Sequence, residues 1–287
     1  MPALACGEVT LHHVERGAGR PVVLVHGFAC GWRLWRSQLR AFAPSCRVVA
    51  YDQRGHGRSA APDDPAAYSE TILADDLAAL IRGLGLAPAH VVGLSLGATV
   101  ALQAATRHPA LLASLTLADG GSGSDDPDAA RRGAAAWVER ARTGGIAAHA
   151  ESMLASPFVE AYLARGGRRA RRHVELLVRQ HPAHGLSHVL LGAVAAREPV
   201  YRRGPALRAL ALPVLVLCGE LDRACRRPAS FLAETIPGAE LRLLPGVGHM
   251  SCLEAPHAFN DAVLGFLERA ERQARPAIRR ELAPARA

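Results

Sequence analysis

Residues 90–98 set narrow limits on how this chain can fold. An apolar, β-branched run leads into them, a helix-prone run at residues 99–107 follows, and Gly93, Ser95 and Gly97 lie between the two. A serine on a tight turn between a strand and a helix takes strained backbone angles, which bring the positions two before and two after it close together. Glycine at both positions removes the Cβ atoms that would collide there. The turn presents the hydroxyl beside the first amides of the helix, so Ser95 is the predicted nucleophile.

Short apolar runs alternate with helical stripes along most of the chain. This alternation predicts an α/β fold with a doubly wound, mostly parallel sheet. An edge strand or hairpin arm is expected at residues 9–15, and a last helix is expected to begin near Pro256. Besides the run before Ser95, buried strands are predicted at residues 21–25, 46–51, 112–118, 213–218 and 239–244.

The alternation stops after the glycine-rich residues 120–124 and resumes near residue 209. The residues between, 125–208, contain helical pieces rich in alanine, leucine and arginine and no strand pattern, which predicts an inserted helical cap. The α/β core is therefore expected to comprise residues 1–124 and 209–272. Residues 273–287 are rich in arginine, proline and alanine and are expected to form a disordered tail.

Composition excludes several classes of protein. With 49% hydrophobic and 21% charged residues, the chain suits a globular fold, and no apolar run approaches the ~18 residues of a membrane span. The six cysteines are scattered, which predicts reduced thiols and a cytoplasmic protein without a signal peptide. All 34 basic residues are arginines, and their doublets are dispersed without interleaved aromatics. This dispersal argues against a nucleic-acid-binding face, and neither nucleic acid nor membrane is an expected partner.

Three reactive side chains are expected at one edge of the sheet, because each follows a predicted strand. In chain order they are Ser95, Asp222 and His249. A serine hydroxyl is a poor nucleophile until a base takes its proton, and His249 is predicted to take it and later to protonate the leaving group. Asp222 is predicted to fix the imidazole tautomer. Asp119 also follows a strand and remains an alternative acid, although the Gly-x-x-Asp setting favours Asp222.

This order of residues resembles the α/β-hydrolase fold superfamily, and the similarity extends from about residue 9 to residue 269. The loop at residues 52–59, which reads Asp-Gln-Arg-Gly-His-Gly-Arg-Ser, is part of the likeness. The resemblance implies that the backbone N–H groups of Phe28 and Leu96 form the oxyanion hole. A serine at position 95 argues against dehalogenase and epoxide hydrolase chemistry, because those relatives place an aspartate there.

The remaining histidines and cysteines are expected to be structural. His26 and His56 lie in loops shaped by glycines, so both are predicted to make structural hydrogen bonds. Three cap histidines, His181, His184 and His188, lack a carboxylate or cysteine at a matching spacing, so no metal site is predicted. Two cysteines near the predicted site, Cys30 and Cys252, are interpreted as small apolar fillers. No cofactor is expected.

Within the superfamily, the chain is similar to 3-oxoadipate enol-lactonases and to small carboxylesterases. The likeness includes the cap sequence Trp-Val-Glu-Arg at residues 137–140, followed by Gly144 and Gly145. The predicted function is hydrolysis of a carboxylic ester of a small molecule through an acyl-enzyme on Ser95. Hydrolysis of an enol-lactone and non-catalytic binding of a small ligand are the alternatives.

The cap is expected to determine which substrate fits. Trp137 is the predicted substrate-binding residue, and an apolar roof would favour modest, largely apolar acyl groups. The candidate roof residues are Trp137, Leu154, Phe158, Tyr162, Leu176 and Leu177. Most cap arginines are expected to face water. An arginine that points inward would instead pair with a carboxylate of the substrate.

Overall fold

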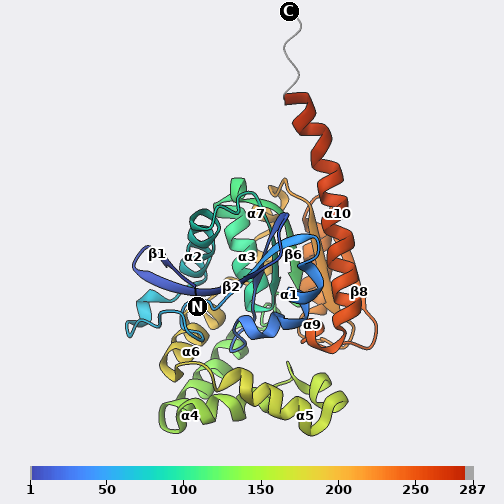
Figure 1. The fold of residues 1–287 in the computed structure, drawn as a ribbon. Coiled ribbons are helices and arrows are strands. Elements are labelled where there is room, and N and C mark those ends of the chain that lie inside the picture. Colours follow the sequence, from blue (N-terminus) through green and yellow to red (C-terminus); the bar gives the residue numbers. More distant parts are fainter. Residues whose placement is uncertain (1, 282–287) are drawn as a thin grey trace, which may run out of the picture.

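The computed structural model describes residues 2–281 and contains a twisted sheet flanked by helices (Figure 1). The eight strands lie in the order β1-β2-β4-β3-β5-β6-β7-β8. The first two strands run antiparallel to their neighbours, and the pairs from β4 to β8 are parallel. The strands are β1 (Ala3–Cys6), β2 (Val9–Arg16), β3 (Arg20–Val25), β4 (Cys46–Tyr51), β5 (Ala89–Leu94), β6 (Leu112–Ala118), β7 (Val214–Gly219) and β8 (Glu240–Leu244). The predicted α/β fold with a mostly parallel sheet is confirmed.

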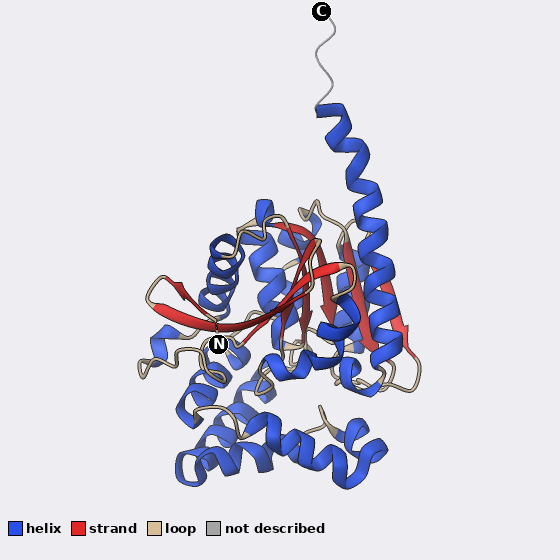
Figure 2. Ribbon diagram, viewed as in Figure 1, coloured by secondary structure: helices blue, strands red, loops and turns tan. Residues whose placement is uncertain are grey.

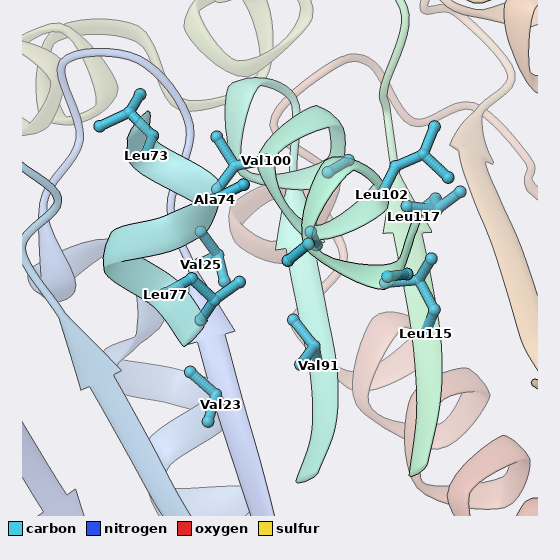
Figure 3. Packing of buried hydrophobic residues seen from close by; sticks show 14 of the residues in the cluster. Val23, Val25, Leu73, Ala74, Leu77, Val91, Val100, Leu102, Leu115 and Leu117 are labelled. Atoms are coloured by element: carbon cyan, nitrogen blue, oxygen red, sulfur yellow. The ribbon is translucent and has the colours of Figure 1, made fainter. Parts of the chain in front are cut away.

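Both faces of the sheet are buried, because alternate side chains of each strand point to opposite sides. Val23 and Val25 belong to one apolar cluster, and their neighbours Val22 and Leu24 belong to the other. Figure 3 shows the first cluster, in which helices α2 (Glu70–Gly83) and α3 (Leu96–Arg107) pack on β3, β5 and β6. Two helices, α1 (Arg36–Phe42) and α10 (Pro256–Glu281), supply apolar side chains to the second cluster. The continuous apolar runs in the sequence reflect this burial on both faces.

A helical insertion between β6 and β7 lies beyond the carboxyl ends of the parallel strands (Figure 2). Its helices are α4 (Pro127–Leu154), α5 (Glu160–Val178) and α6 (Ala183–Val189), with a π-helical turn at Leu190–Ala195. The short helix α7 (Gly204–Arg208), which was expected to belong to the cap, lies at the opposite end of the sheet and leads into β7 (Figure 1). Helix α4 bends at Gly145 and α5 bends at Gly167, both with positive φ values of 56° and 52°. Glycine allows these angles at low cost. The bends let the two long helices fold over the edge of the sheet.

The structure differs from the sequence-based expectations at both ends of the chain. Strand β1 was not expected, because it has only four residues, most of them are accessible to solvent, and apolar and polar residues do not clearly alternate along it. Helix α10 continues to Glu281, whereas a disordered tail was expected from residue 273. Residues 282–287 of that expected tail lie outside the described residues. Among the helices within residues 2–281, none has the length and apolarity needed to cross a membrane.

Three shorter elements complete the core. The 3-10 turn at Trp32–Trp35 leads into α1, and helix α8 (Arg226–Thr235) connects β7 to β8. The short helix α9 (Ser251–Glu254) follows the loop after β8 and precedes α10. These connections place the loops after β3, β5, β6, β7 and β8 at the edge of the sheet that faces the insertion.

Candidate active site

The turn at Ser95 has the strained geometry that its sequence predicted. Ser95 has φ 54° and ψ −113°, outside the region that non-glycine residues normally occupy. A Cβ atom on Gly93 would lie 2.2 Å from the carbonyl oxygen of Gly97, and one on Gly97 would lie 2.0 Å from that of Val25. Both positions therefore require glycine. The Ser95 amide donates to the Ala118 carbonyl at 2.8 Å, which ties the turn to the neighbouring strand β6.

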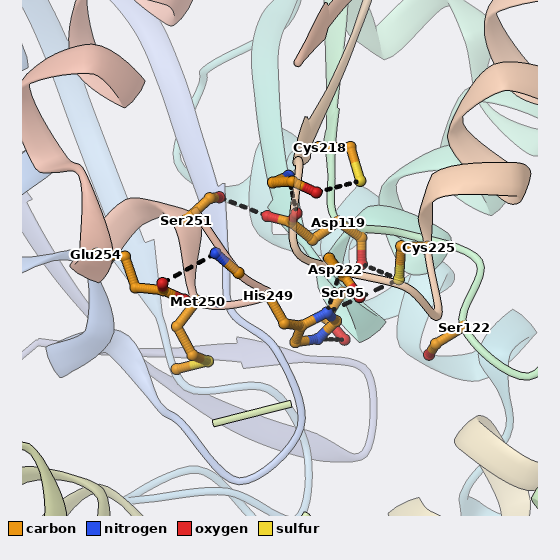
Figure 4. A network of polar contacts seen from close by, with 12 residues as sticks. Ser95, Asp119, Ser122, Cys218, Asp222, Cys225, His249, Met250, Ser251 and Glu254 are labelled. Carbon is orange, nitrogen blue, oxygen red and sulfur yellow. Dashed lines mark hydrogen bonds and ion pairs between the residues drawn. The ribbon is translucent and has the colours of Figure 1, made fainter. Parts of the chain in front are cut away.

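A chain of hydrogen bonds connects Ser95, His249 and Asp222 (Figure 4). The Oγ of Ser95 lies 2.9 Å from Nε2 of His249, and Nδ1 of His249 lies 2.7 Å from Oδ2 of Asp222. Burial alone would raise the pKa of Asp222, but the attraction of His249 outweighs it and holds that pKa below its ordinary value. For His249, burial lowers the pKa. The charge and hydrogen bond of Asp222 more than offset this effect, so the net shift of the His249 pKa is upward. The carboxylate thus keeps Nδ1 protonated and leaves Nε2 facing the serine.

The alternative acid, Asp119, is directed elsewhere. Its Oδ1 accepts a hydrogen bond from the Gly219 amide at 2.8 Å, and its Oδ2 accepts one from the Ser251 hydroxyl. Within the described residues it makes no hydrogen bond to His249. Its side chain is fully buried, and burial raises its pKa to about 7. Asp119 therefore connects the end of β7 to the segment that follows His249, while Asp222 contacts the imidazole.

A further carboxylate, that of Glu254, holds the loop that carries His249, and the sequence did not single it out. Glu254 accepts hydrogen bonds from the amides of Gly248 at 2.9 Å and Met250 at 3.1 Å, the two residues that flank His249. These bonds fix the backbone on both sides of the imidazole. The only sequence signal for this role is the position of Glu254 in the first turn of a helix shortly after the loop, which is too common a pattern to be informative.

Three neutral histidines hold the loop that carries Phe28 and the neighbouring loop at residues 52–59. His26 Nε2 accepts a hydrogen bond from the Gln53 amide at 3.0 Å, and His56 Nε2 accepts one from the Ala29 amide at 3.1 Å. From the cap, His181 Nδ1 accepts from the Gly57 amide at 2.7 Å. A ring nitrogen that accepts from an amide carries no proton, so each imidazole is neutral. Burial agrees with this assignment, because it lowers the pKa of His56 to about 4 and lowers the pKa values of the other two. His26 and His56 thus have the predicted structural role.

Phe28 and Leu96 line the same cavity as Ser95, between the sheet edge and the insertion. Leu96 is the first residue of helix α3, so its N–H has no partner within the helix. In the part of the chain that the structure describes, neither amide donates to a protein acceptor. This geometry leaves both donors available to an oxygen of a bound molecule.

A cavity of about 400 Å³ lies between the sheet edge and the insertion, with Ser95 and His249 in its wall. Its lining is mostly apolar, which suits a small organic ligand. Trp137 packs edge-to-face on Phe28 with ring centroids 5.7 Å apart, and its Nε1 donates to His149 Nδ1 at 2.9 Å. Phe158 lies over His249 at 4.6 Å between ring centroids.

The roof of the cavity agrees only partly with the expected one. Trp137, Phe158 and Leu177 line it. Three other expected roof residues, Leu154, Tyr162 and Leu176, do not line it, and Leu176 is 60% exposed. Helix α5 is amphipathic, and its rotation about its own axis places Leu177 inward and Leu176 outward, a difference that the composition of the segment does not reveal. Two arginines, Arg140 and Arg197, line the cavity, which fits the alternative in which an arginine points inward while most cap arginines face water.

Three polar side chains at the site lie close enough together to resemble the ligands of a metal ion. Ligand atoms of Asp222, Cys225 and His249 lie within 4.8 Å of one another. Cysteine binds metals as a thiolate, and burial raises the pKa of Cys225 well above its ordinary range, which keeps it a thiol. Its Sγ lies 3.2 Å from the carbonyl oxygen of Asp119, at hydrogen-bond distance for a thiol donor. In this arrangement the thiol donates to the Asp119 carbonyl, and the imidazole and the Asp222 carboxylate are hydrogen-bonded to each other.

Comparisons with known proteins agree with the geometry. The family described as alpha/beta hydrolase fold matches residues 20–256. A protein of Caulobacter vibrioides named "Putative carbamate hydrolase RutD" is 32% identical over 90% of this chain and 95% of its own. Two similar solved structures are an esterase from Thermogutta terrifontis (TM-score 0.81, 29% identity, 91% of this chain and 94% of that one) and the enol-lactonase from Burkholderia xenovorans LB400 (TM-score 0.79, 27% identity, 93% and 100%).

Proposed function

The chain belongs to the alpha/beta hydrolase fold family, and we propose that it is a serine hydrolase that cleaves a carboxylic ester of a small molecule. One observation carries this proposal: the continuous hydrogen-bond chain from Ser95 through His249 to Asp222, with bonds of 2.9 and 2.7 Å, at the wall of an apolar cavity. The comparisons support membership of the hydrolase family. The catalytic roles of Ser95, His249 and Asp222 are part of the proposal.

The first half of the reaction forms an acyl-enzyme. Ser95 Oγ attacks the ester carbonyl while His249 Nε2 accepts the hydroxyl proton. The carbonyl oxygen becomes negatively charged, and the amides of Phe28 and Leu96 donate hydrogen bonds to it. Asp222 stabilises the imidazolium that forms on His249. The tetrahedral intermediate then collapses, and His249 returns the proton to the departing alcohol.

The second half releases the acid. A water molecule takes the place of the alcohol and gives a proton to His249 as it attacks the acyl-enzyme. The same two amides hold the second oxyanion. Collapse of this intermediate breaks the bond to Ser95 Oγ, which recovers its proton from His249. The free enzyme and a carboxylic acid are the products.

An enol-lactone hydrolase is the second candidate function, and the likeness to the Burkholderia enol-lactonase favours it. A lactone is a cyclic ester, so the steps are the same, except that the leaving group stays attached to the acyl chain. A panel containing linear esters, an enol-lactone and a carbamate compares the reactions for which the similar proteins are named.

Replacement of Ser95 by alanine tests the proposal. We expect Ser95→Ala to lower kcat/KM for 4-nitrophenyl esters by more than about 1,000-fold while the protein still folds. A fluorophosphonate probe should label the wild-type protein and leave Ser95→Ala unlabelled. Ser37→Ala is the matched control, because Ser37 lies in α1 outside the cavity. Activity of Ser95→Ala within tenfold of wild type would refute the assignment, and an unlabelled, inactive wild type would favour a non-catalytic binding protein.

A further inference from the structure

The wall of the cavity, as the described residues form it, carries positive charge and no carboxylate. Among the residues that line it, all within the described part of the chain, there is no aspartate or glutamate, whereas Arg140 and Arg197 both contribute. Most of the other lining residues are apolar, so the described wall of this cavity offers the two arginines no negative charge. Such a wall repels cations and attracts anions.

Arg197 differs from Arg54 and Arg203, two other partly buried arginines of this protein. Arg54 pairs with Asp76 through two hydrogen bonds of 2.8 and 2.7 Å, and Arg203 pairs with Glu70 at 2.8 and 2.5 Å. Arg197 has no carboxylate within 4.0 Å among the described residues. Burial lowers the pKa of Arg197, and the more distant charge of Glu70 offsets this only in part.

The orientation of Arg197 is nevertheless fixed. Its Nη2 donates to the Ser122 carbonyl and, at 2.9 Å, to the Ser122 hydroxyl. Ser122 and Gly123 line the same cavity, on the loop that follows β6. Within residues 2–281, Nε and Nη1 of Arg197 donate to no protein acceptor. Because Arg197 lacks a charged partner yet is held in one orientation, it can receive an acceptor from a bound molecule.

We propose that Arg197 binds a carboxylate of the substrate, so that the enzyme acts on an ester or lactone carrying a free acid group. This inference rests on the proposed hydrolase function. Arg140 lies in the same wall and donates to the Ser152 hydroxyl at 3.1 and 3.3 Å. It supplies a second positive charge to the cavity. The apolar remainder, including Trp137 and Phe158, encloses the carbon chain between the acid group and the scissile bond.

Two matched pairs of esters test this specificity. In the first, 4-nitrophenyl pentanoate is compared with the mono-4-nitrophenyl ester of glutaric acid, which replaces the terminal methyl group by a carboxylate. In the second, butyl acetate is compared with 4-acetoxybutanoate, which places the acid on the alcohol side. We expect kcat/KM to be at least tenfold higher for the acid in one of the pairs. No preference for the acid in either pair would overturn the proposal.

Substitution of Arg197 tests whether this side chain causes the preference for the acid over the neutral ester. Arg197→Met should reduce the ratio of kcat/KM for the acid over the neutral ester by about 100-fold, since loss of one partner from an enclosed charge pair has effects of this order. Arg197→Lys should restore part of the ratio, because it keeps the charge but loses the planar fork. Arg132→Met is the control, since Arg132 is an exposed cap arginine outside the cavity. An unchanged ratio in Arg197→Met would refute the assignment.

Binding to the Ser95→Ala variant separates this inference from the proposed function. Calorimetry with the glutarate ester should give a Kd about 100-fold higher for Ser95→Ala/Arg197→Met than for Ser95→Ala alone. Thermal unfolding checks the fold, and Arg197→Met should unfold at no lower temperature than wild type, because it removes an uncompensated charge. If Ser95→Ala retains ester turnover, the proposed function fails while the binding comparison still reports on Arg197. Equal Kd values with an inactive Ser95→Ala would refute the carboxylate site alone.

Discussion

Exchange of each candidate acid for asparagine distinguishes Asp222 from Asp119. Asp222 lies 2.7 Å from Nδ1 of His249 and accepts its proton in a hydrogen bond. An asparagine that turns its NH₂ group toward Nδ1 would favour the other tautomer, with the proton on Nε2, and His249 could then no longer accept a proton from Ser95. We expect Asp222→Asn to lower kcat by about 10⁴-fold, the effect of holding the wrong tautomer.

Asp119→Asn should act on stability rather than on turnover. The folded state keeps the Asp119 proton up to a pKa of about 7, whereas an ordinary carboxyl loses it near 3.8. The unfolded chain therefore ionises first as the pH rises, and the folded state becomes less stable between pH 3.8 and about 7. This difference in pKa corresponds to about 4 kcal/mol as an upper estimate. Asparagine removes that cost and can still accept from the Gly219 amide.

The two variants are measured side by side by steady-state turnover of a 4-nitrophenyl ester and by urea unfolding at pH 5 and pH 8. Asp119→Asn should keep kcat within about tenfold of wild type, because Asp119 makes no hydrogen bond to His249. Its gain in stability should be largest at pH 8, and at pH 5 it should be about a third of that value. If Asp119→Asn lost more kcat than Asp222→Asn, Asp119 would be the acid and the tautomer argument would be wrong.

Three further predictions concern the base, the serine turn and the loop histidines. The attraction of Asp222 raises the pKa of His249 overall, so kcat/KM should fall on the acid side with a midpoint above pH 6.5, and a flat pH–rate profile from 5 to 9 would contradict a histidine base. Gly97→Ala should destabilise the fold by at least about 3 kcal/mol in urea unfolding, since its Cβ would meet a backbone carbonyl at 2.0 Å. Gly133→Ala, where a Cβ meets nothing within 4 Å, is its control and should not be destabilised. Because His56 has a pKa of about 4 when folded and about 6.5 when unfolded, its contribution to stability should decline by about 3 kcal/mol as the pH falls through this range, and urea unfolding of His56→Gln should lack that contribution.

The sequence by itself determined the sheet and the strained turn at Ser95, because both follow from local rules. Continuous apolar runs between turns identify strands buried on both faces, and seven of the eight strands, the predicted edge strand β2 included, lie within one or two residues of their predicted positions. The turn at Ser95 was equally predictable, since the collisions that exclude a Cβ at Gly93 and Gly97 involve neighbouring residues or the adjacent strand. A short edge strand such as β1 has no comparable signal, because little of it is buried.

Only the tertiary structure decided which side chains meet across long separations in the chain. Asp119 and Asp222 both follow strands, and the choice between them depends on the paths of two loops that converge on His249. The cap arginines are a second case in which the sequence alone does not decide which side chain reaches the site. They are alike in sequence, and the inward position of Arg197 results from its bonds to Ser122, 75 residues earlier. Local patterns define turns and elements, whereas the placement of a single charge depends on packing between segments that the sequence does not bring together.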